Sequence, residues 1–322
     1  MKKIGTMYEK LFAEIQKAER IAILSHVPPD GDALGSMLAL YEALRNIGKQ
    51  VDAYTHEVPA TYTFMPGLDA LKKEPQSTAY DLVILVDCAD VRMLGPFLPI
   101  YESAGMTASI DHHISNSGNG KVNVLDFEAS SAAQIVLSVL EAGNLPITVS
   151  MATNLYVGIS TDTGNFCYSN VNARTFEDVA RLMRFGADLT FAANNLYKRR
   201  TLLKTRLFGQ AIQNLELFAQ GRLAVMVIDH PDFEALGSSE LDYEGVIDFA
   251  RDVDTVEVAV LMRRARENRY KISLRSKNGV DVNAIAQHFG GGGHKQASGC
   301  MIRGTQQEVR DALIAEISKV LS

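Results

Sequence analysis

Six side chains able to bind a divalent cation occur at four places in residues 26–162, each at the end of an expected strand or helix. They comprise four carboxylates and two imidazoles: His26, Asp30, Asp32, Asp87, His112 and Asp162. Four carboxylates in one pocket would repel one another strongly unless protons or cations neutralised them. Two divalent ions resolve this repulsion, and we expect one carboxylate, Asp87, to bridge them at a separation of about 3.5–4 Å.

The ligand types indicate which metal to expect. Oxygen and imidazole ligands without thiolate suit Mn²⁺, with magnesium, cobalt or iron as alternatives and zinc weakly disfavoured by the number of carboxylates. Each residue also has a simpler explanation: Asp32 can cap the following helix, Asp162 can belong to a turn before Gly164, and adjacent histidines can be structural. Four such places in one domain favour the metal site.

A second group of residues, near the C-terminus, has the composition of an anion-binding loop. Four glycines at 290–293 are followed by His294 and Lys295. Bare glycine backbone can turn several N–H groups toward an anion, and the two side chains add positive charge. The spacing matches neither Walker A nor the dinucleotide-binding fingerprint. A flexible turn is the simpler alternative, but the basic segment ending at Arg275 favours phosphate binding.

The elements that must position the first group alternate between strand and helix. Apolar runs predict strands at 20–25, 51–55, 81–87 and 107–111, and helical patterns occur at 7–19, 32–47, 130–142, 149–160 and 173–185. This alternation predicts an α/β domain with a mostly parallel sheet. The carboxyl ends of parallel strands line one crevice, so the candidate ligands can converge there.

The rest of the chain has a different order. We expect a linker helix over 191–219, then strands at 223–228, 256–262 and 269–275, the glycine loop at 290–293 and a final helix at 305–320. The expected domains are therefore a catalytic domain, 1–190, the linker, 191–219, and a smaller α/β domain, 220–322.

Length and composition fit a soluble two-domain protein. The chain has 322 residues, 47% of them apolar and 22% charged. It has no apolar run of membrane-spanning length and no signal-peptide core. Three well-separated cysteines fit a reducing cytoplasm. We therefore expect a cytoplasmic protein without a membrane partner.

Charge is unevenly distributed along the chain. The net charge is −6, which disfavours tight non-specific binding of duplex nucleic acid. Basic clusters nevertheless occur at 198–206 and 263–277. Local basic patches within an acidic protein fit a small or short anionic ligand better than a long polyanion, although solvated faces are the simpler explanation.

These motifs resemble the DHH phosphoesterase superfamily, named for the triplet present here as Asp111-His112-His113. The segment 291–299 is similar to the partner domain of that superfamily, DHHA1. Length and layout resemble the group of bifunctional oligoribonucleases and pAp phosphatases, called nanoRNases, over nearly the whole chain.

The resemblance implies roles for individual residues. It implies two manganese ions, one held by His26, Asp30 and Asp87 and the other by Asp32, Asp87, His112 and Asp162. It implies that His113 approaches the scissile phosphate, and we assign the catalytic roles to His113 and Asp111. It also implies that the far end of the nucleotide is held by Arg275, Gly291, Gly292, Gly293 and His294.

The expected function is manganese-dependent hydrolysis of short oligoribonucleotides to mononucleotides, of pAp to AMP, or of both. Water between the two ions would attack phosphorus. The expected partners are short single-stranded RNA or DNA oligonucleotides or nucleotide bisphosphates, and a homodimer is left open. The alternatives are a cyclic dinucleotide phosphodiesterase and a non-catalytic nucleotide-binding or RNA-binding protein. A manganese pyrophosphatase shares the triplet, but the glycine loop argues against it.

Two departures from related sequences bear on substrate preference. Relatives often have Ser-Ser-Thr followed by Ala-Glu where this chain has Ser130-Ser131-Ala132-Ala133-Gln134. Cys167 stands where relatives often have a larger residue.

Overall fold

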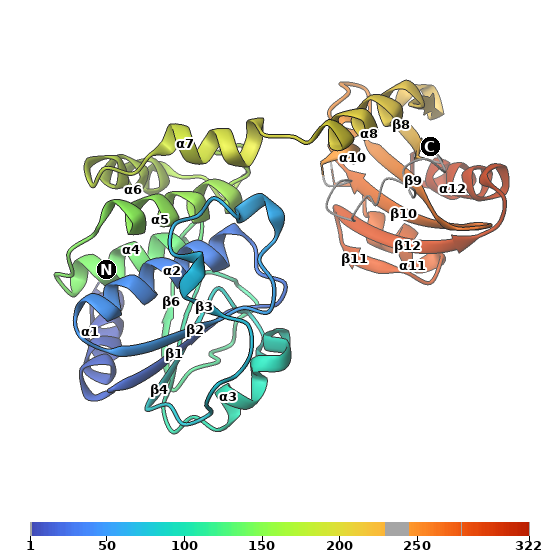
Figure 1. Ribbon diagram of the computed structural model, residues 1–322. Helices are drawn as coiled ribbons and strands as arrows, with labels where there is room; N and C mark the ends of the chain where they lie inside the picture. The colour runs from blue at the N-terminus through green and yellow to red at the C-terminus, as the bar shows by residue number, and fades with distance from the viewer. Residues whose placement is uncertain (1, 229–244, 278, 322) are drawn as a thin grey trace. The chain divides into compact units, whose positions relative to one another are not determined.

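The computed structural model of the chain describes residues 2–228, 245–277 and 279–321, which fall into two units with a boundary between Arg199 and Arg200 (Figure 1). Each unit contains one six-stranded sheet. None of the described helices combines the length and the apolar composition that spanning a bilayer requires.

Parallel strands form the sheet of the first unit, in the spatial order β3-β2-β1-β4-β5-β6. Their bounds are Arg20–Leu24 (β1), Gln50–Tyr54 (β2), Leu71–Lys72 (β3), Leu82–Val86 (β4), Thr107–Asp111 (β5) and Val122–Leu125 (β6). Every residue of β4 is buried, as its unbroken apolar run predicts for a strand covered on both faces. Two strands were not predicted from the sequence: β3, which has two residues, and β6, whose apolar run is interrupted by Asn123. The predicted α/β class with a mostly parallel sheet is confirmed for this unit.

Close contact between two helices of this unit depends on glycine. The helices are Lys2–Lys17 (α1), Gly31–Asn46 (α2), Leu98–Glu102 (α3), Ala132–Ala142 (α4), Val149–Asp162 (α5), Ala173–Arg184 (α6) and Leu189–Ala193 (α7). A Cβ on Gly35 of α2 would lie 2.3 Å from the main-chain oxygen of Asn154 on α5. A Cβ on Gly158 of α5 would lie 2.8 Å from Asp32 Oδ1. These glycines let α2 and α5 touch, which brings Asp32 toward the end of α5.

Two aspartates near the start of α2, Asp30 and Asp32, have different roles. Asp30 is the N-cap, because its Oδ1 accepts hydrogen bonds from the backbone N–H groups of Asp32 and Ala33, both at 3.0 Å. The alternative in which Asp32 caps this helix is therefore wrong. Asp32 lies in the first turn, and its carboxylate has other partners.

The stretch 191–219 is not the continuous linker helix expected from the sequence. The α7 helix passes into a π-helical turn at Asn194–Lys198, and α8 begins separately at Leu202–Gln213. Thr201 separates them: its backbone is extended, and its hydroxyl accepts a hydrogen bond from the N–H of Lys204. Threonine is a preferred N-cap, so a new helix starts here. The short strand β7 (Glu216–Phe218) follows.

The second unit has a mixed sheet in the order β11-β12-β10-β9-β8-β7. Its further strands are Leu223–Ile228 (β8), Val258–Arg266 (β9), Arg269–Ser276 (β10), Gly292–His294 (β11) and Ala297–Arg303 (β12). One face packs on α8 and α10 (Val246–Arg251), and the other packs on α11 (Val282–His288) and α12 (Gln306–Leu321). The predicted strands and final helix are confirmed, but part of the expected glycine loop is strand β11, paired with β12.

Candidate active site

The candidate ligands of the first unit converge at the carboxyl edge of its sheet. His26 follows β1, Asp87 follows β4 and His112 follows β5, while Asp162 ends α5. Asp32 joins them from the first turn of α2. Neighbouring parallel strands end at the same edge, so side chains distant in sequence become neighbours there.

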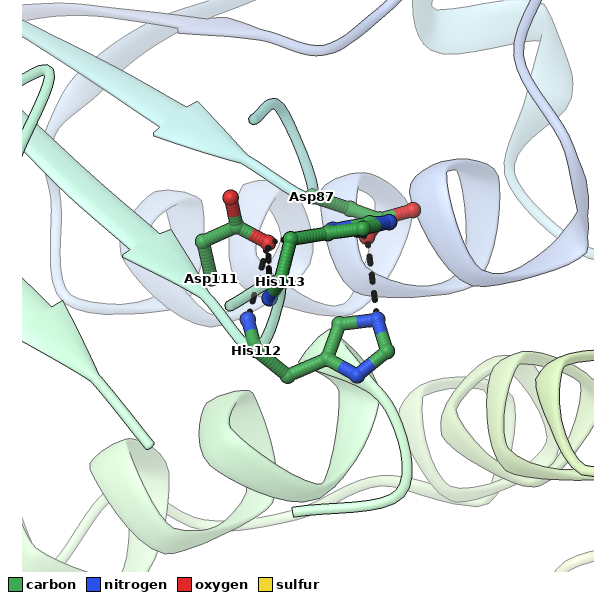
Figure 2. A group of neighbouring side chains, drawn as sticks. All are labelled: Asp87, Asp111, His112 and His113. Atoms are coloured by element: carbon green, nitrogen blue, oxygen red, sulfur yellow. Dashed lines mark hydrogen bonds and ion pairs between the residues drawn. The ribbon is translucent and has the colours of Figure 1, made fainter. Parts of the chain in front are cut away.

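Asp87 lies at the centre of this group. Its Oδ2 is 3.6 Å from His26 Nε2. Its Oδ1 is 3.6 Å from His112 Nε2 (Figure 2). Both distances are too long for a good hydrogen bond. Among the described residues, Asp87 Oδ1 and His112 Nε2 are buried and have no hydrogen-bond partner. Buried polar atoms are normally hydrogen-bonded, so each of these two atoms lacks the partner that burial requires.

Three overlapping sets of candidate donors surround Asp87 and His112. One consists of His26, Asp30 and Asp87, the second of Asp32, His112 and Asp162, and the third of Asp87, Asp111, His112 and His113; within each set, the ligand atoms all lie within 4.8 Å of one another. In the third set, Asp111 Oδ1 and His113 Nδ1 already contact each other at 2.8 Å, so the first two are the candidate metal-binding sets. Nε2 of His112 is 3.4 Å from Asp162 Oδ2 and 4.0 Å from Asp32 Oδ2. Ligand atoms about 2.1 Å from a shared metal, at angles of about 90–120°, lie roughly 3.0–3.6 Å apart. The spacing around Asp87 and His112 therefore fits bound cations.

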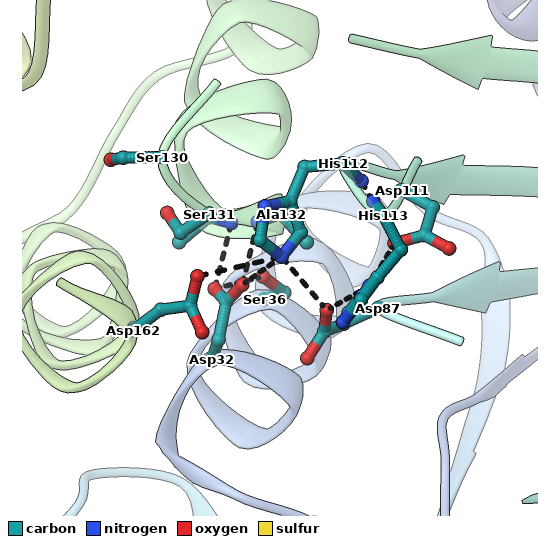
Figure 3. Close-up of polar contacts among 12 residues, drawn as sticks. Asp32, Ser36, Asp87, Asp111, His112, His113, Ser130, Ser131, Ala132 and Asp162 are labelled. Carbon is teal, nitrogen blue, oxygen red and sulfur yellow. Dashed lines mark hydrogen bonds and ion pairs between the residues drawn. The ribbon is translucent and has the colours of Figure 1, made fainter. Parts of the chain in front are cut away.

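Asp32 is held by the N-terminus of α4 (Figure 3). Its Oδ2 accepts a hydrogen bond from the N–H of Ala132 at 2.6 Å, and its Oδ1 accepts one from the N–H of Ala133 at 2.9 Å. The side chain is completely buried. Burial and the nearby charges of Asp87 and Asp162 raise the pKa of Asp32 well above its usual value. Without a cation, this carboxylate is therefore poorly compensated.

The other groups of the site perturb one another's pKa. Burial lowers the pKa of both His26 and His112, but contacts with Asp87 and its neighbours outweigh burial and raise each to about 10. Burial and the charge of Asp87 raise the pKa of Asp162 to about 6, although His112 opposes this. Asp87 is buried, but its two histidine neighbours hold its pKa well below the usual value. Protons on the imidazoles thus balance part of the carboxylate charge, and a divalent cation can replace them.

Asp111, the last residue of β5, forms hydrogen bonds with the loop that follows this strand. Its Oδ1 lies 2.8 Å from His113 Nδ1 and accepts hydrogen bonds from the N–H groups of His112 and His113 (Figure 2). Its Oδ2 accepts a hydrogen bond from Asn116. Asp111 is fully buried, whereas 43% of the His113 side chain is exposed. These contacts tie Asp111 to the backbone of His112 and His113 and to the His113 ring, and the catalytic role assigned to Asp111 from the sequence stays a prediction.

Within the stretch that departs from related sequences, Gln134 makes buried side-chain contacts. Oε1 of Gln134 accepts hydrogen bonds from both the N–H and the hydroxyl of Ser130, at 2.6 and 2.7 Å. Its Nε2 donates to Asp178, which is completely buried. The site beside Asp178 therefore requires a donor, which an amide supplies and an ionised carboxylate does not. Cys167 is exposed, and no described contact explains its identity.

Several supporting residues were not predicted from the sequence. They are Ser36, Asn116, Gln134, Asn170 and the backbone N–H groups of Ala132 and Ala133. For the stretch 130–134, the sequence indicated only a departure from relatives. Nothing in the spacing of the others indicated a role.

Four of the five candidate phosphate-binding residues of the second unit lie on the two strands that flank β12: Arg275 on β10, and Gly292, Gly293 and His294 on β11. Arg275 on β10 and His294 on β11 are both paired with Ala297 of β12. Residues opposite one another in antiparallel strands project to the same face, so Arg275 and His294 flank Ala297 on one face. Gly293 has φ 149°, and a Cβ there would lie 2.6 Å from the oxygen of Ala297. Only glycine fits at that position.

Comparison with known proteins places the chain in a family. The description "DHH family, N-terminal domain" matches residues 20–159, and "DHHA1 domain" matches residues 230–322. A bifunctional oligoribonuclease and PAP phosphatase NrnA from Thermus thermophilus is 33% identical over 301 residues, covering 92% of this chain and 88% of that protein. The protein of the same name from Bacillus subtilis is 26% identical over 300 residues, covering 92% and 93%.

Solved structures share the fold. An exopolyphosphatase-related protein from Bacteroides fragilis has a TM-score of 0.87 and 24% identity, with 98% of this chain and 97% of that chain covered. Exonuclease RecJ bound to manganese has a TM-score of 0.52 and 14% identity, with 99% and 94% covered. Together with the relatives above, the fold and the carboxylate–histidine site define a hydrolase. The chain belongs to the DHH family of phosphoesterases, with a DHHA1 domain in its second unit.

Proposed function

We propose that this chain is a manganese-dependent phosphoesterase that hydrolyses short oligoribonucleotides to mononucleotides and pAp to AMP. The names of relatives at 33% and 26% identity support these substrates. The observation that carries the proposal is the position of Asp87, whose two oxygens face His26 and His112, one histidine from each donor set.

Each candidate metal-binding set would bind one of two metal ions. His26, Asp30 and Asp87 would hold one ion, and the set of Asp32, His112 and Asp162 would hold the other with Asp87 shared. Bound divalent ions lower the pKa of water and offset negative charge on phosphate oxygens. All six candidate ligands are present, which disfavours a non-catalytic binding protein.

His113 is the residue that we propose contacts the scissile phosphate. Its Nδ1 faces Asp111 at 2.8 Å, which fixes the ring and leaves Nε2 for the substrate. The hydrogen bond with Asp111 raises the pKa of His113 and thus favours the doubly protonated ring. In that form the Nε2–H can donate to a phosphate oxygen as negative charge develops there. Asp111 then acts only through His113.

Residues of the second unit would bind the part of the substrate remote from the reaction. Arg275 and His294 project from the same face of the sheet and can both contact a phosphate. Gly291, Gly292 and Gly293 add backbone that a ligand can approach closely. A second phosphate on the substrate, as in pAp or a dinucleotide, supplies the group to be bound.

We place the enzyme in the cytoplasm, in agreement with its three free cysteines. Its proposed partners are short single-stranded oligonucleotides and nucleotide bisphosphates. The homodimer stays a prediction.

The test is a hydrolysis assay with Mn²⁺ that compares pAp, dinucleotides, a 24-mer and cyclic di-AMP. We expect turnover of pAp and dinucleotides, with the 24-mer and cyclic di-AMP hydrolysed much more slowly. Preferred hydrolysis of cyclic di-AMP would replace the proposed substrate class, and no hydrolysis of any phosphoester would refute the proposed function.

A further inference from the structure

The side chain of Asn170 connects two segments that carry or support candidate metal ligands. It lies between the end of α5 and the start of α6, and its Nδ2 donates to the main-chain oxygens of Ser130 at 2.9 Å and Asp162 at 3.1 Å. Ser130 is 40 residues earlier in the chain than Asn170. One amide group thus fixes the distance between two backbone segments.

Each of the two segments positions one carboxylate of the set of Asp32, His112 and Asp162. The first segment contains Asp162 itself, whose carboxylate lies 3.4 Å from His112 Nε2. Ser130 immediately precedes Ser131, the N-cap of α4, and the next two N–H groups hold both oxygens of Asp32 (Figure 3). The Asn170 bonds therefore link the supports of Asp32 and Asp162. Neither of these two hydrogen bonds reaches the set of His26, Asp30 and Asp87.

The loop that returns from Asp162 to Asn170 has an unusual backbone. Gly164, Asn165 and Phe166 have φ values of 55°, 54° and 65°, so three consecutive residues are in the left-handed region. Glycine and asparagine tolerate this region, whereas a bulky residue such as Phe166 needs surrounding contacts to hold it there. The bonds of Asn170 close this loop on the side of α4.

We propose that Asn170 is a positioning residue that sets the separation of the Asp32 and Asp162 carboxylates and thereby the affinity of one of the two metal positions. The inference rests on the two-ion function proposed above. Carboxylates that share a site repel each other when no cation is bound. Fixed backbone supports keep both in place for the incoming ion, whereas without the amide the loop can relax and the carboxylates separate.

Asn154 provides a matched control on α5. It is buried, and its Nδ2 donates to the main-chain oxygen of Pro66 at 3.0 Å. Like Asn170, it has an Oδ1 without a hydrogen-bond partner among the described residues. The loop that contains Pro66 carries no candidate ligand. Loss of this amide should reduce stability without changing metal binding.

The experiment is titration of the metal-free full chain with Mn²⁺, followed by electron paramagnetic resonance of the free ion, for wild type, Asn170→Ala, Asn170→Asp and Asn154→Ala. Thermal unfolding of each metal-free protein is measured in parallel. We expect wild type and Asn154→Ala each to bind two ions, and we expect the affinities of Asn154→Ala to match those of wild type. Asn170→Ala should keep one ion and bind the other about 10- to 100-fold more weakly, the usual effect of losing a residue that orients ligands. Asn170→Asp should be weaker still, because a carboxylate would face two carbonyl oxygens.

Two results would overturn the inference alone: unchanged binding of both ions by Asn170→Ala, or equal weakening in Asn154→Ala. Wild-type protein that binds fewer than two ions would overturn the two-ion function and the inference with it. Should Asn170→Ala fail to fold, Asn170→Ser, which keeps a shorter donor, is titrated in its place with the same expected loss at one position.

Discussion

Asp87 Oδ1 and His112 Nε2 face each other across 3.6 Å inside the protein, and neither has a hydrogen-bond partner among the described residues. Buried polar atoms are almost always hydrogen-bonded, so this pair requires an explanation. Asp87 Oδ1 and His112 Nε2 could both act as ligands of a divalent cation, which would satisfy both atoms. The other oxygen of Asp87 faces His26 in the same way, at 3.6 Å.

Replacement of Asp87 should abolish hydrolysis while leaving the fold intact. Metal ions supply several kcal/mol of transition-state stabilisation, and each 1.36 kcal/mol is a factor of ten, so we expect a loss of at least about a thousandfold in kcat. Asp87 has φ 51°, a conformation that asparagine tolerates better than alanine. Asp87→Asn should therefore unfold at a temperature closer to that of wild type than Asp87→Ala does. Steady-state kinetics and circular dichroism melts measure both effects; near-normal turnover by either variant with manganese bound would refute the shared-ligand role.

Removal of divalent ions should stop the reaction, and Mn²⁺ should restore it best. The donor set of four carboxylates and two imidazoles motivates this prediction. Protein dialysed against a chelator is checked by elemental analysis and assayed with pAp before and after each metal is added. Hydrolysis by protein shown to be metal-free would contradict the mechanism, and better restoration by magnesium, cobalt or iron would replace the metal assignment.

Replacement of Gln134 by glutamate should destabilise the first unit. The introduced carboxylate would face the buried Asp178 and would lack the donor that Nε2 now supplies. We expect Gln134→Glu to lower the free energy of unfolding by about 2–4 kcal/mol, measured by urea denaturation. The control is Gln134→Glu combined with Asp178→Asn, which restores a donor opposite an acceptor and should recover part of the loss. Equal stability of wild type and Gln134→Glu would show that the pair is not coupled.

Arg275→Ala and His294→Ala should impair substrate binding without changing metal stoichiometry. Each removes a charge-assisted contact worth roughly 1.5–3 kcal/mol when it is well buried, which corresponds to about one to two orders of magnitude in kcat/KM. The loss should be larger for pAp or a dinucleotide than for bis-p-nitrophenyl phosphate, which lacks a second phosphate. An equal loss on both substrates, or a loss of bound manganese, would assign these residues to the reaction centre or to the fold.

The parallel sheet of the first unit and the convergence of the six candidate ligands at its edge were predictable because the information is local. An apolar run of five or so residues followed by an acidic or histidine residue places that side chain at the edge of a sheet, as for Asp87 after β4. The periodic helices 149–160 and 173–185 were predictable for the same reason. Cap chemistry was less certain, since Asp30 and Asp32 are both suitable caps and only the backbone geometry shows that Asp30 is the cap.

The contacts that orient the ligands were not predictable, because they connect distant segments through groups without a sequence signature. The N–H groups of Ala132 and Ala133 bind an aspartate 100 and 101 residues earlier. Asn170 binds main-chain oxygens, which every residue type has. The break in the expected linker helix depends on Thr201, one of several threonines that could cap a helix.

The most direct measurement is an anomalous difference map from crystals of the protein grown with Mn²⁺. We expect two peaks about 3.5–4 Å apart, with one oxygen of Asp87 on each, His26 and Asp30 beside one peak, and Asp32, His112 and Asp162 beside the other. A single peak, or two peaks without Asp87 between them, would contradict the proposal that Asp87 joins two metal ions in one catalytic site.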